Sequence, residues 1–327
     1  MYKLVIINGD QEAYDVTQIS SKVEWGGRKG SAPRYVKATL MDDDGDGHPR
    51  IPIDCANGYH MMLYEDDKEL FRGIITQHSQ DSKKTLDATA KDNMFYLSNN
   101  KDTFVYQNKR ADEVFSDALT RCGMTPGVVT NTGYVIPDLV KVKKTYYDTI
   151  LDALSTTYKA TKNRYYVNST QGVINLFKRS EAATLWVMEV GENITDYSYS
   201  KSIEKIKTRV RLLSKDDAVV YEQSNAALEA KIGIFQDIKS IDDTYNDAQM
   251  KELVESMFAE SGNPEQTLNV SGIGITDVTA GGCVYVVIPH LSIARPFYID
   301  EDTHTFEGNK HTMKVKLNFA DDISTIS

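Results

Sequence analysis

Residues 191–213, GENITDYSYSKSIEKIKTRVRLL, lie between two parts of the chain whose sequence patterns differ. The second half of this stretch alternates between two kinds of residue. One side carries Ile206, Thr208, Val210 and Leu212, and the other carries Lys205, Lys207, Arg209 and Arg211. Period-two alternation is typical of a strand with one buried face and one solvent-exposed face. We therefore predict a strand over 203–213, at the start of a second β region.

The composition indicates a folded protein with two domains or three small ones. The chain has 327 residues, of which 41% are hydrophobic and 26% are charged, which is ordinary for a globular protein. The formal net charge is -10. A general nucleic-acid binder normally carries a basic surplus, so we expect no sequence-specific nucleic-acid partner.

The cysteines and the N-terminus indicate where the chain is made. Cys55, Cys122 and Cys283 are odd in number and far apart, a pattern that gives neither a disulfide framework nor a zinc site. Free thiols suit a reducing cytosol. The short apolar run at residues 1–7 lacks the features of a signal peptide, and no run reaches the roughly 18 apolar residues of a membrane span. We expect synthesis in the cytoplasm and no membrane partner.

Residues 1–103 carry short apolar or alternating runs separated by turn residues such as Asn8-Gly9 and Asn57-Gly58. The predicted strands are Lys3–Ile7, Tyr35–Met41, Tyr59–Tyr64, Glu69–Ser79 and Thr85–Lys91. Many short strands with regular turns are typical of a small barrel or sandwich, which is the prediction for this region.

Residues 104–190 read as an α+β domain. Apolar residues at helical spacing predict helices over 109–122, with Asn108 as N-cap, and over 146–159. A hairpin is predicted over 164–177.

From 191 to 327 the pattern is again β, with a helical insertion at about 223–264. The helix of this insertion spans 244–261 and is capped by Thr244. The predicted fold class is β-rich α+β.

Two stretches are candidate metal sites. Residues Asp42 to Gly47 fit the first half of an EF-hand calcium loop. However, Ile53 occupies the position of the bidentate Glu, and no helix is predicted on either side of the loop. An acidic turn is therefore favoured, and weak calcium binding is the alternative. His304 and His311 flank a turn, with His290 and Cys283 upstream. Their spacing matches no catalytic metal signature, so a structural hairpin over 303–313 is favoured.

No familiar catalytic motif is present. The chain has no G-x-S-x-G, H-E-x-x-H or C-x-x-C, and its glycine pairs lack the context of a phosphate loop. Two carboxylates that converge only in the fold would escape this search. We predict no catalytic residue, no cofactor, no metal and no enzymatic activity.

The basic row, Lys205, Lys207, Arg209 and Arg211, allows two interpretations. Like charges two residues apart on one strand face repel unless water or carboxylates screen them. The row is therefore either a solvated strand face or a subunit interface at which an acidic neighbour supplies the opposing carboxylates.

Several stretches, taken in order, resemble the baseplate hub proteins of contractile phage tails and tail-like particles, in particular the PBSX-type prophage branch. The most distinctive of them is GENITDYSYSKSIE at 191–204. The others are NKRADEVF at 108–115, CGMTPG at 122–127, KTYYDTILDAL at 144–154, FYID at 297–300, HTFEG at 304–308 and HTM at 311–313.

The resemblance implies a homotrimeric ring in which each subunit contributes two β-barrels, at 1–103 and 191–327. Six barrels would face the hexameric tail tube, and the other side would meet the trimeric spike. The implied partners are the tube protein, the spike protein and other baseplate or tube-initiator proteins, assembled in the baseplate of a phage or a bacteriocin. Because the sequence ends without a lysozyme-like or spike extension, these would be separate proteins. A cell-wall hydrolase and a carbohydrate-binding receptor module are the alternatives.

Overall fold

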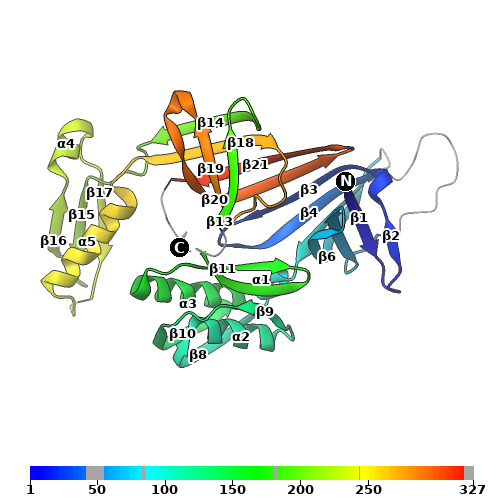
Figure 1. Ribbon diagram of the computed structural model, residues 1–327. Helices are drawn as coiled ribbons and strands as arrows, with labels where there is room; N and C mark the ends of the chain where they lie inside the picture. The colour runs from blue at the N-terminus through cyan, green and yellow to red at the C-terminus, as the bar shows by residue number, and fades with distance from the viewer. Residues whose placement is uncertain (42–54, 83–84, 180–182, 243, 320–327) are drawn as a thin grey trace. The chain divides into compact units, whose positions relative to one another are not determined.

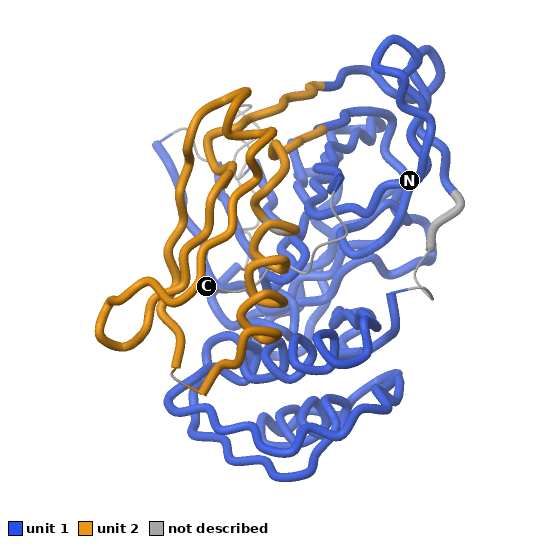
Figure 2. The backbone as a smooth tube through the Cα atoms, turned by 90° about the vertical axis from the view of Figure 1, so that its left-hand side faces the viewer, with its two compact units in different colours: residues 1–197, 269–327 blue, residues 198–268 orange. Residues whose placement is uncertain are grey.

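The computed structural model describes residues 1–41, 55–82, 85–179, 183–242 and 244–319. Strands dominate, and helices occupy the middle of the chain (Figure 1). The predicted β-rich α+β class is thus confirmed. Contacts divide the chain into a larger unit, 1–197 with 269–327, and a smaller unit, 198–268 (Figure 2). The predicted domain bounds at 103 and 190 fall inside the larger unit. None of the described helices is long and apolar enough to cross a membrane.

The first part of the larger unit is a run of antiparallel strands. They are β1 (Tyr2–Ile7), β2 (Ala13–Asp15), β3 (Ser20–Arg28), β4 (Ser31–Met41), β5 (His60–Glu65), β6 (Lys68–Gln80) and β7 (Thr85–Asp92). Alternation decides which face is buried: Leu86, Ala88 and Ala90 on β7 point into the core, and the residues between them are partly exposed. The five strands predicted in this region are confirmed, and β2 and β3 are additions.

The end of the chain extends the same sheet. Its strands are β13 (Ala183–Glu189), β14 (Ile194–Ser202), β18 (Glu265–Ile273), β19 (Cys283–Ile288), β20 (Ile293–Glu307) and β21 (Lys310–Asn318). The first half of β20 pairs with β19, and its second half pairs with β3. Strands from both ends of the chain therefore form one path, running β14-β18-β21-β20-β3-β4-β7-β6-β5-β1-β2. In the described residues this path has two ends, and the two closed barrels remain a prediction.

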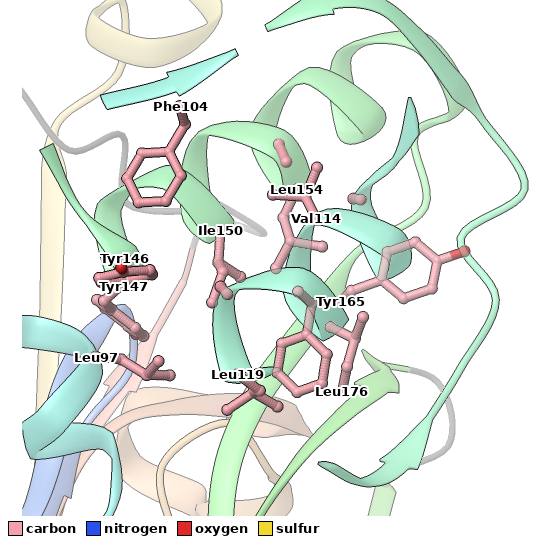
Figure 3. Close-up of a cluster of buried hydrophobic side chains, with 14 of the residues drawn as sticks. Leu97, Phe104, Val114, Leu119, Tyr146, Tyr147, Ile150, Leu154, Tyr165 and Leu176 are labelled. Carbon is pink, nitrogen blue, oxygen red and sulfur yellow. The ribbon is translucent and has the colours of Figure 1, made fainter. Parts of the chain in front are cut away.

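Helices and two small sheets lie between these strand sets in the sequence. They are α1 (Met94–Asn99), β8 (Lys101–Arg110), α2 (Ala111–Arg121), β9 (Pro126–Val129), β10 (Val135–Thr145), α3 (Tyr146–Thr161), β11 (Tyr165–Thr170) and β12 (Val173–Lys178). The inner faces of α2 and α3 share one apolar core with β8 and β10, which includes Phe104, Val114, Leu119, Ile150 and Leu154 (Figure 3).

Helix α3 and the β11–β12 hairpin confirm their predictions, whereas the cap of α2 differs. Helix α3 begins after Thr145, whose hydroxyl accepts the Asp148 N–H at 2.9 Å. The predicted cap of α2, Asn108, instead lies within β8 at a φ of 52°. Helix α2 is capped at Arg110, whose backbone N–H donates to the Glu113 carboxylate at 2.9 Å.

The smaller unit is a three-stranded sheet with two helices. Its elements are β15 (Arg209–Leu213), β16 (Val219–Ser224), α4 (Ala226–Ile232), β17 (Gln236–Ser240) and α5 (Asp247–Ser261). Central β15 runs antiparallel to β16 and parallel to β17. Val210 and Leu212 bury one face of the sheet against Met250 and Val254 of α5. The helical insertion predicted at 223–264 falls inside this unit.

Two predictions for the smaller unit were wrong in detail. The strand expected over 203–213 begins only at Arg209, because Ile203 to Ile206 form a turn closed by an N–H···O=C bond of 3.0 Å. This strand belongs to the sheet of the smaller unit. Helix α5 is capped by Asn246, not Thr244, because Asn246 and Gln249 form a reciprocal capping box.

We expect Ile150→Ala to lower the free energy of unfolding by about 2–5 kcal/mol, because Ile150 is fully buried and its loss leaves a cavity. Chemical denaturation would measure this. Val140→Ala, at a position exposed to solvent, is the control and should change stability by less than about 0.5 kcal/mol. Equal losses in the two variants would contradict the assigned core.

Candidate functional site

A buried ion pair joins β4 to β20 in the larger unit. The Arg34 guanidinium donates two parallel hydrogen bonds to the Asp302 carboxylate, at 2.7 Å and 2.7 Å. The Asp302 side chain is fully buried, and it also accepts the Ala280 N–H at 2.6 Å. Burial disfavours the charged guanidinium, but the attraction of Asp302 outweighs it and raises the pKa of Arg34. Two strands from opposite ends of the sequence are therefore held together by a bidentate, charge-assisted pair.

Asp92 extends this polar cluster to α1. Its carboxylate accepts the backbone N–H of Arg34 at 3.2 Å and that of Met94 at 3.0 Å. Burial raises the pKa of Asp92 to about 7, against the opposing effect of these hydrogen bonds and of the Arg34 charge. The carboxyl group thus ties the end of β7, β4 and the start of α1 together.

A histidine pair lies beside Trp25 and Asp302, with His304 Nε2 3.6 Å from the Asp302 carboxylate. The His304 ring is 4.9 Å from the Trp25 ring, and the Arg34 guanidinium is 4.6 Å from the same indole. His304 Nδ1 is 3.1 Å from His311 Nε2, and its Nε2 is 3.0 Å from the Val278 carbonyl oxygen. Burial lowers the pKa of His304 to about 4. The contact between buried His304 and partly buried His311 joins the two strands of the β20–β21 hairpin, and the hairpin predicted over 303–313 is confirmed.

The other residues weighed with this pair lie elsewhere. His290 contacts the Tyr197 hydroxyl, and Cys283 lies on β19 opposite Tyr298. In the described residues no group of three or more His, Cys, Asp or Glu side chains could hold a metal ion. The acidic stretch Asp42 to Asp46, weighed as a calcium loop, lies outside the described residues.

The structure divides the predicted basic row between a turn and a strand. Lys205 lies in the turn before β15 and is 3.1 Å from Glu265. Arg209 donates to both oxygens of Glu229, at 2.9 Å and 3.0 Å, and Arg211 bonds Glu222. The carboxylates expected from a neighbouring subunit are therefore supplied to these three residues by the smaller unit itself. The interface role of Lys205, Lys207, Arg209 and Arg211 remains a prediction.

The outer face of the β8–β10 ribbon exposes valines. Val105, Val140 and Val142 are 63%, 58% and 60% exposed, and Val105 lies directly opposite Val140. Their neighbours Phe104, Tyr106 and Leu139 point inward to the α2–α3 core. We call the three exposed side chains the valine surface. Clustered exposed apolar side chains of this kind are typical of interaction surfaces.

A second exposed apolar surface lies on the β13–β19 pair. Val187 and Tyr285 are neighbours in the register and are 45% and 40% exposed on one face of this pair. The valine surface, in contrast, has a signal in the sequence. Val140, Lys141, Val142 and Lys143 alternate between apolar and charged residues, a pattern that predicts a strand with one apolar face. Only helices and a hairpin are predicted from the sequence in residues 104–190, so β8 and β10 are additions.

The chain matches the model of the YqbQ-like family over residues 23–318. It belongs to the YqbQ-like family. One relative in Bacillus subtilis (strain 168) is the phage-like element PBSX protein XkdQ, which is 33% identical over 303 residues, spanning 91% of this chain and 92% of the relative. The predicted resemblance to the PBSX-type branch is confirmed.

Solved structures show that the fold is shared over nearly the whole chain. The 43 kDa tail protein of prophage MuSo2 from Shewanella oneidensis superposes with a TM-score of 0.72, at 11% identity, over 97% of this chain and 98% of that one. The c3393 protein of E. coli, a component of the type VI secretion system with structural similarity to T4 tail proteins gp27 and gp5, gives 0.56 at 9% identity, over 92% and 74%. At these identities the likeness concerns the fold.

Asp302→Asn should lower the free energy of unfolding by about 3–5 kcal/mol, because it leaves the Arg34 charge buried without its partner. Denaturant titration would measure the loss. The matched control is Glu265→Gln, which removes the carboxylate from the exposed pair with Lys205 and should cost less than about 1 kcal/mol. If Glu265→Gln lowered the free energy of unfolding as much as Asp302→Asn, the buried pair would contribute no more to stability than the exposed pair, contrary to this prediction.

His304 should make stability depend on pH. Its pKa is about 4 in the folded chain against a reference value of 6.5, so between these values the unfolded chain binds a proton that the folded chain does not. The free energy of unfolding contributed by His304 therefore falls as pH drops from 6.5 to about 4. Asp92, with its raised pKa, has the opposite sign in this range.

The measurement is accordingly the difference in slope between the natural chain and His304→Gln across that pH range. The variant should show the weaker loss on acidification, and the exposed His60→Gln serves as control. An unchanged slope in His304→Gln would show that folding does not lower the pKa of His304.

Proposed function

We propose that this chain is the structural baseplate hub of a contractile tail, a homotrimeric ring that joins the hexameric tail tube to the trimeric spike. The observation that carries the proposal is the fold, shared end to end with the MuSo2 tail protein. Family kinship with a PBSX protein and similarity to a type VI component related in structure to gp27 and gp5 support it.

The sheet arrangement offers a physical basis for symmetry matching. Two sets of strands, β1–β7 and β13–β21 without the smaller unit, are joined where β20 passes from β19 to β3. Two such sets per chain, each closing as a barrel, would present six similar units in a trimer. A three-fold ring could then meet a six-fold tube through repeated interfaces.

The polar cluster favours a structural role over catalysis. Asp302 and His304 have fully buried side chains, so a substrate has no access to the described His–Asp pair. The exposed chemistry lies instead in the valine surface and in the β13–β19 surface, which suit protein contacts. Tube protein, spike protein and other baseplate or tube-initiator proteins are the proposed partners, and the virion or tail-like particle is the proposed place of assembly.

Native mass spectrometry and light scattering of the purified chain, alone and with its tube and spike proteins, would test the hub. We expect a species of three copies. A chain that stays monomeric in all these mixtures would overturn the ring. Turnover of purified peptidoglycan would favour the hydrolase alternative, and saturable glycan binding without turnover would favour the receptor module.

The valine surface should be needed for assembly. Val140→Asp with Val142→Asp places charges on an exposed face, so the fold should persist while incorporation into particles falls at least about tenfold, since two charges are desolvated at a contact. Electron microscopy and immunoblotting of particles would measure incorporation. Val128→Asp, at an isolated exposed valine of the same unit, is the control. Normal particles from the double variant would exclude this surface from the contacts.

For the basic row we choose Lys205 and Lys207 for substitution. The pair of Lys205 with Glu265 is exposed to solvent, whereas Arg209 and Arg211 are less exposed and bond Glu229 and Glu222. Lys205→Glu with Lys207→Glu should reduce particle assembly without changing the melting temperature by more than about 2 °C. Lys231→Glu with Lys251→Glu changes the charge of the smaller unit equally and is the control. If both double variants assemble normally, the basic row is a solvated surface.

A further inference from the structure

A cavity of about 220 Å³ lies inside the larger unit, beside the buried ion pair. The end of the β3–β4 hairpin, helix α3, strand β11 and the segment at Ala280 and Gly281 surround it. A cavity of about 150 Å³ accepts a benzene molecule. This one therefore has room for an amino-acid side chain of leucine size together with a carboxylate group.

The walls of the cavity are of two kinds. One part is apolar and aromatic, formed by Met94, Tyr147, Leu151, Tyr165, Val167 and Phe177. The other part carries the cations Arg28, Lys29, Arg34 and Lys159. The carboxylate of the lining, Asp152, is 2.7 Å from Lys141, which is not a lining residue. The lining is therefore cationic overall, in a chain whose formal net charge is -10.

Two of these cations already serve the fold, and two do not. Arg34 bonds Asp302, and Lys29 Nζ is 3.5 Å from Asp300. Arg28 and Lys159 are exposed, and in the described part of the chain neither has a carboxylate within 4.0 Å. They are positioned on different elements, the β3–β4 hairpin and α3, so an anion at the cavity would be held from two sides.

The environment of Lys29 also favours an added anion. Its side chain is 5% exposed, and burial lowers its pKa despite the attraction of Asp300. A further negative charge entering the cavity would stabilise the ammonium form. An acidic ligand would thus offset part of the free-energy cost of keeping the Lys29 ammonium group buried.

We propose that this cavity is a docking site for an acidic segment of a partner protein, which inserts an aliphatic side chain against the aromatic wall and a carboxylate between Arg28 and Lys159. A peptide suits the site better than a nucleic acid, because the cavity is narrow and the acidic chain repels a polyanion over longer distances. The proposal concerns binding by the isolated chain and does not depend on the hub role.

The test uses a fluorescent peptide with blocked ends and the sequence Asp-Leu-Asp-Leu, titrated with the full chain and followed by anisotropy. We expect saturable binding that weakens as salt rises. Arg28→Gln with Lys159→Gln should weaken binding by about tenfold or more, since two charge-assisted contacts are lost. Lys231→Gln with Lys251→Gln removes two cations from the smaller unit and should leave binding unchanged.

Three results would overturn the proposal. They are equal binding of the matched peptide Asn-Leu-Asn-Leu, unchanged binding by Arg28→Gln with Lys159→Gln, and tighter binding of a single-stranded oligonucleotide than of the acidic peptide. Displacement of the peptide by equimolar inorganic phosphate would show a general anion site and would equally exclude peptide docking. Melting curves of both double variants ensure that folded proteins are compared.

Discussion

The larger unit depends on the buried contact between Arg34 and Asp302. These residues are 268 positions apart in the sequence. Their contact therefore closes a very long loop, and the entropy lost on closing that loop opposes it. Loss of one partner from a buried ion pair is strongly destabilising, because the other charge is left buried without compensation. The Ala280 N–H adds a further hydrogen bond to Asp302. The contact therefore selects one arrangement of the two strand sets, because a misplaced Arg34 would remain buried without compensation.

The same arginine links three features that differ in kind. Its guanidinium lies over the Trp25 ring, which also contacts His304 of the His304–His311 pair. Its backbone N–H bonds Asp92 at the start of α1, and its side chain also forms part of the cavity wall. The geometry of the cavity therefore depends on the packing of the sheet. Arg28, one of the cations of the cavity lining, lies at the end of the β3–β4 hairpin, and the ion pair of Arg34 holds this hairpin against β20.

Local patterns in the sequence predicted many elements but not their partners. Helix α3 and the β11–β12 hairpin follow from spacing and turn residues, which act within a few positions. The alternation at 203–213 misled because Ile203 to Ile206 form a turn, although Val210 and Leu212 do face a core as expected. A period marks which residues share a face; it carries no information about where regular backbone begins.

The candidate site was less accessible from sequence, for a physical reason. Nothing local distinguishes Arg34 from the other arginines or Asp302 from the other aspartates, since their environment arises only from long-range pairing. The acidic partners of the basic row, Glu222 and Glu229, come from β16 and α4, and neither position has a pattern that points to β15. The valine surface, by contrast, had a local signal in the alternation of Val140, Lys141 and Val142.

Strand β20 has a mechanical consequence. This strand of fifteen residues pairs with β19 over 293–298, with β21 over 298–307 and with β3 over 301–306. A slip of one residue would turn every side chain to the opposite face, and on β20 it would do so in two ladders at once. A force pulling along β20 would therefore load its ladders with β21 and β3 in shear. The two strand sets, β1–β7 and β13–β21, would resist such a force together.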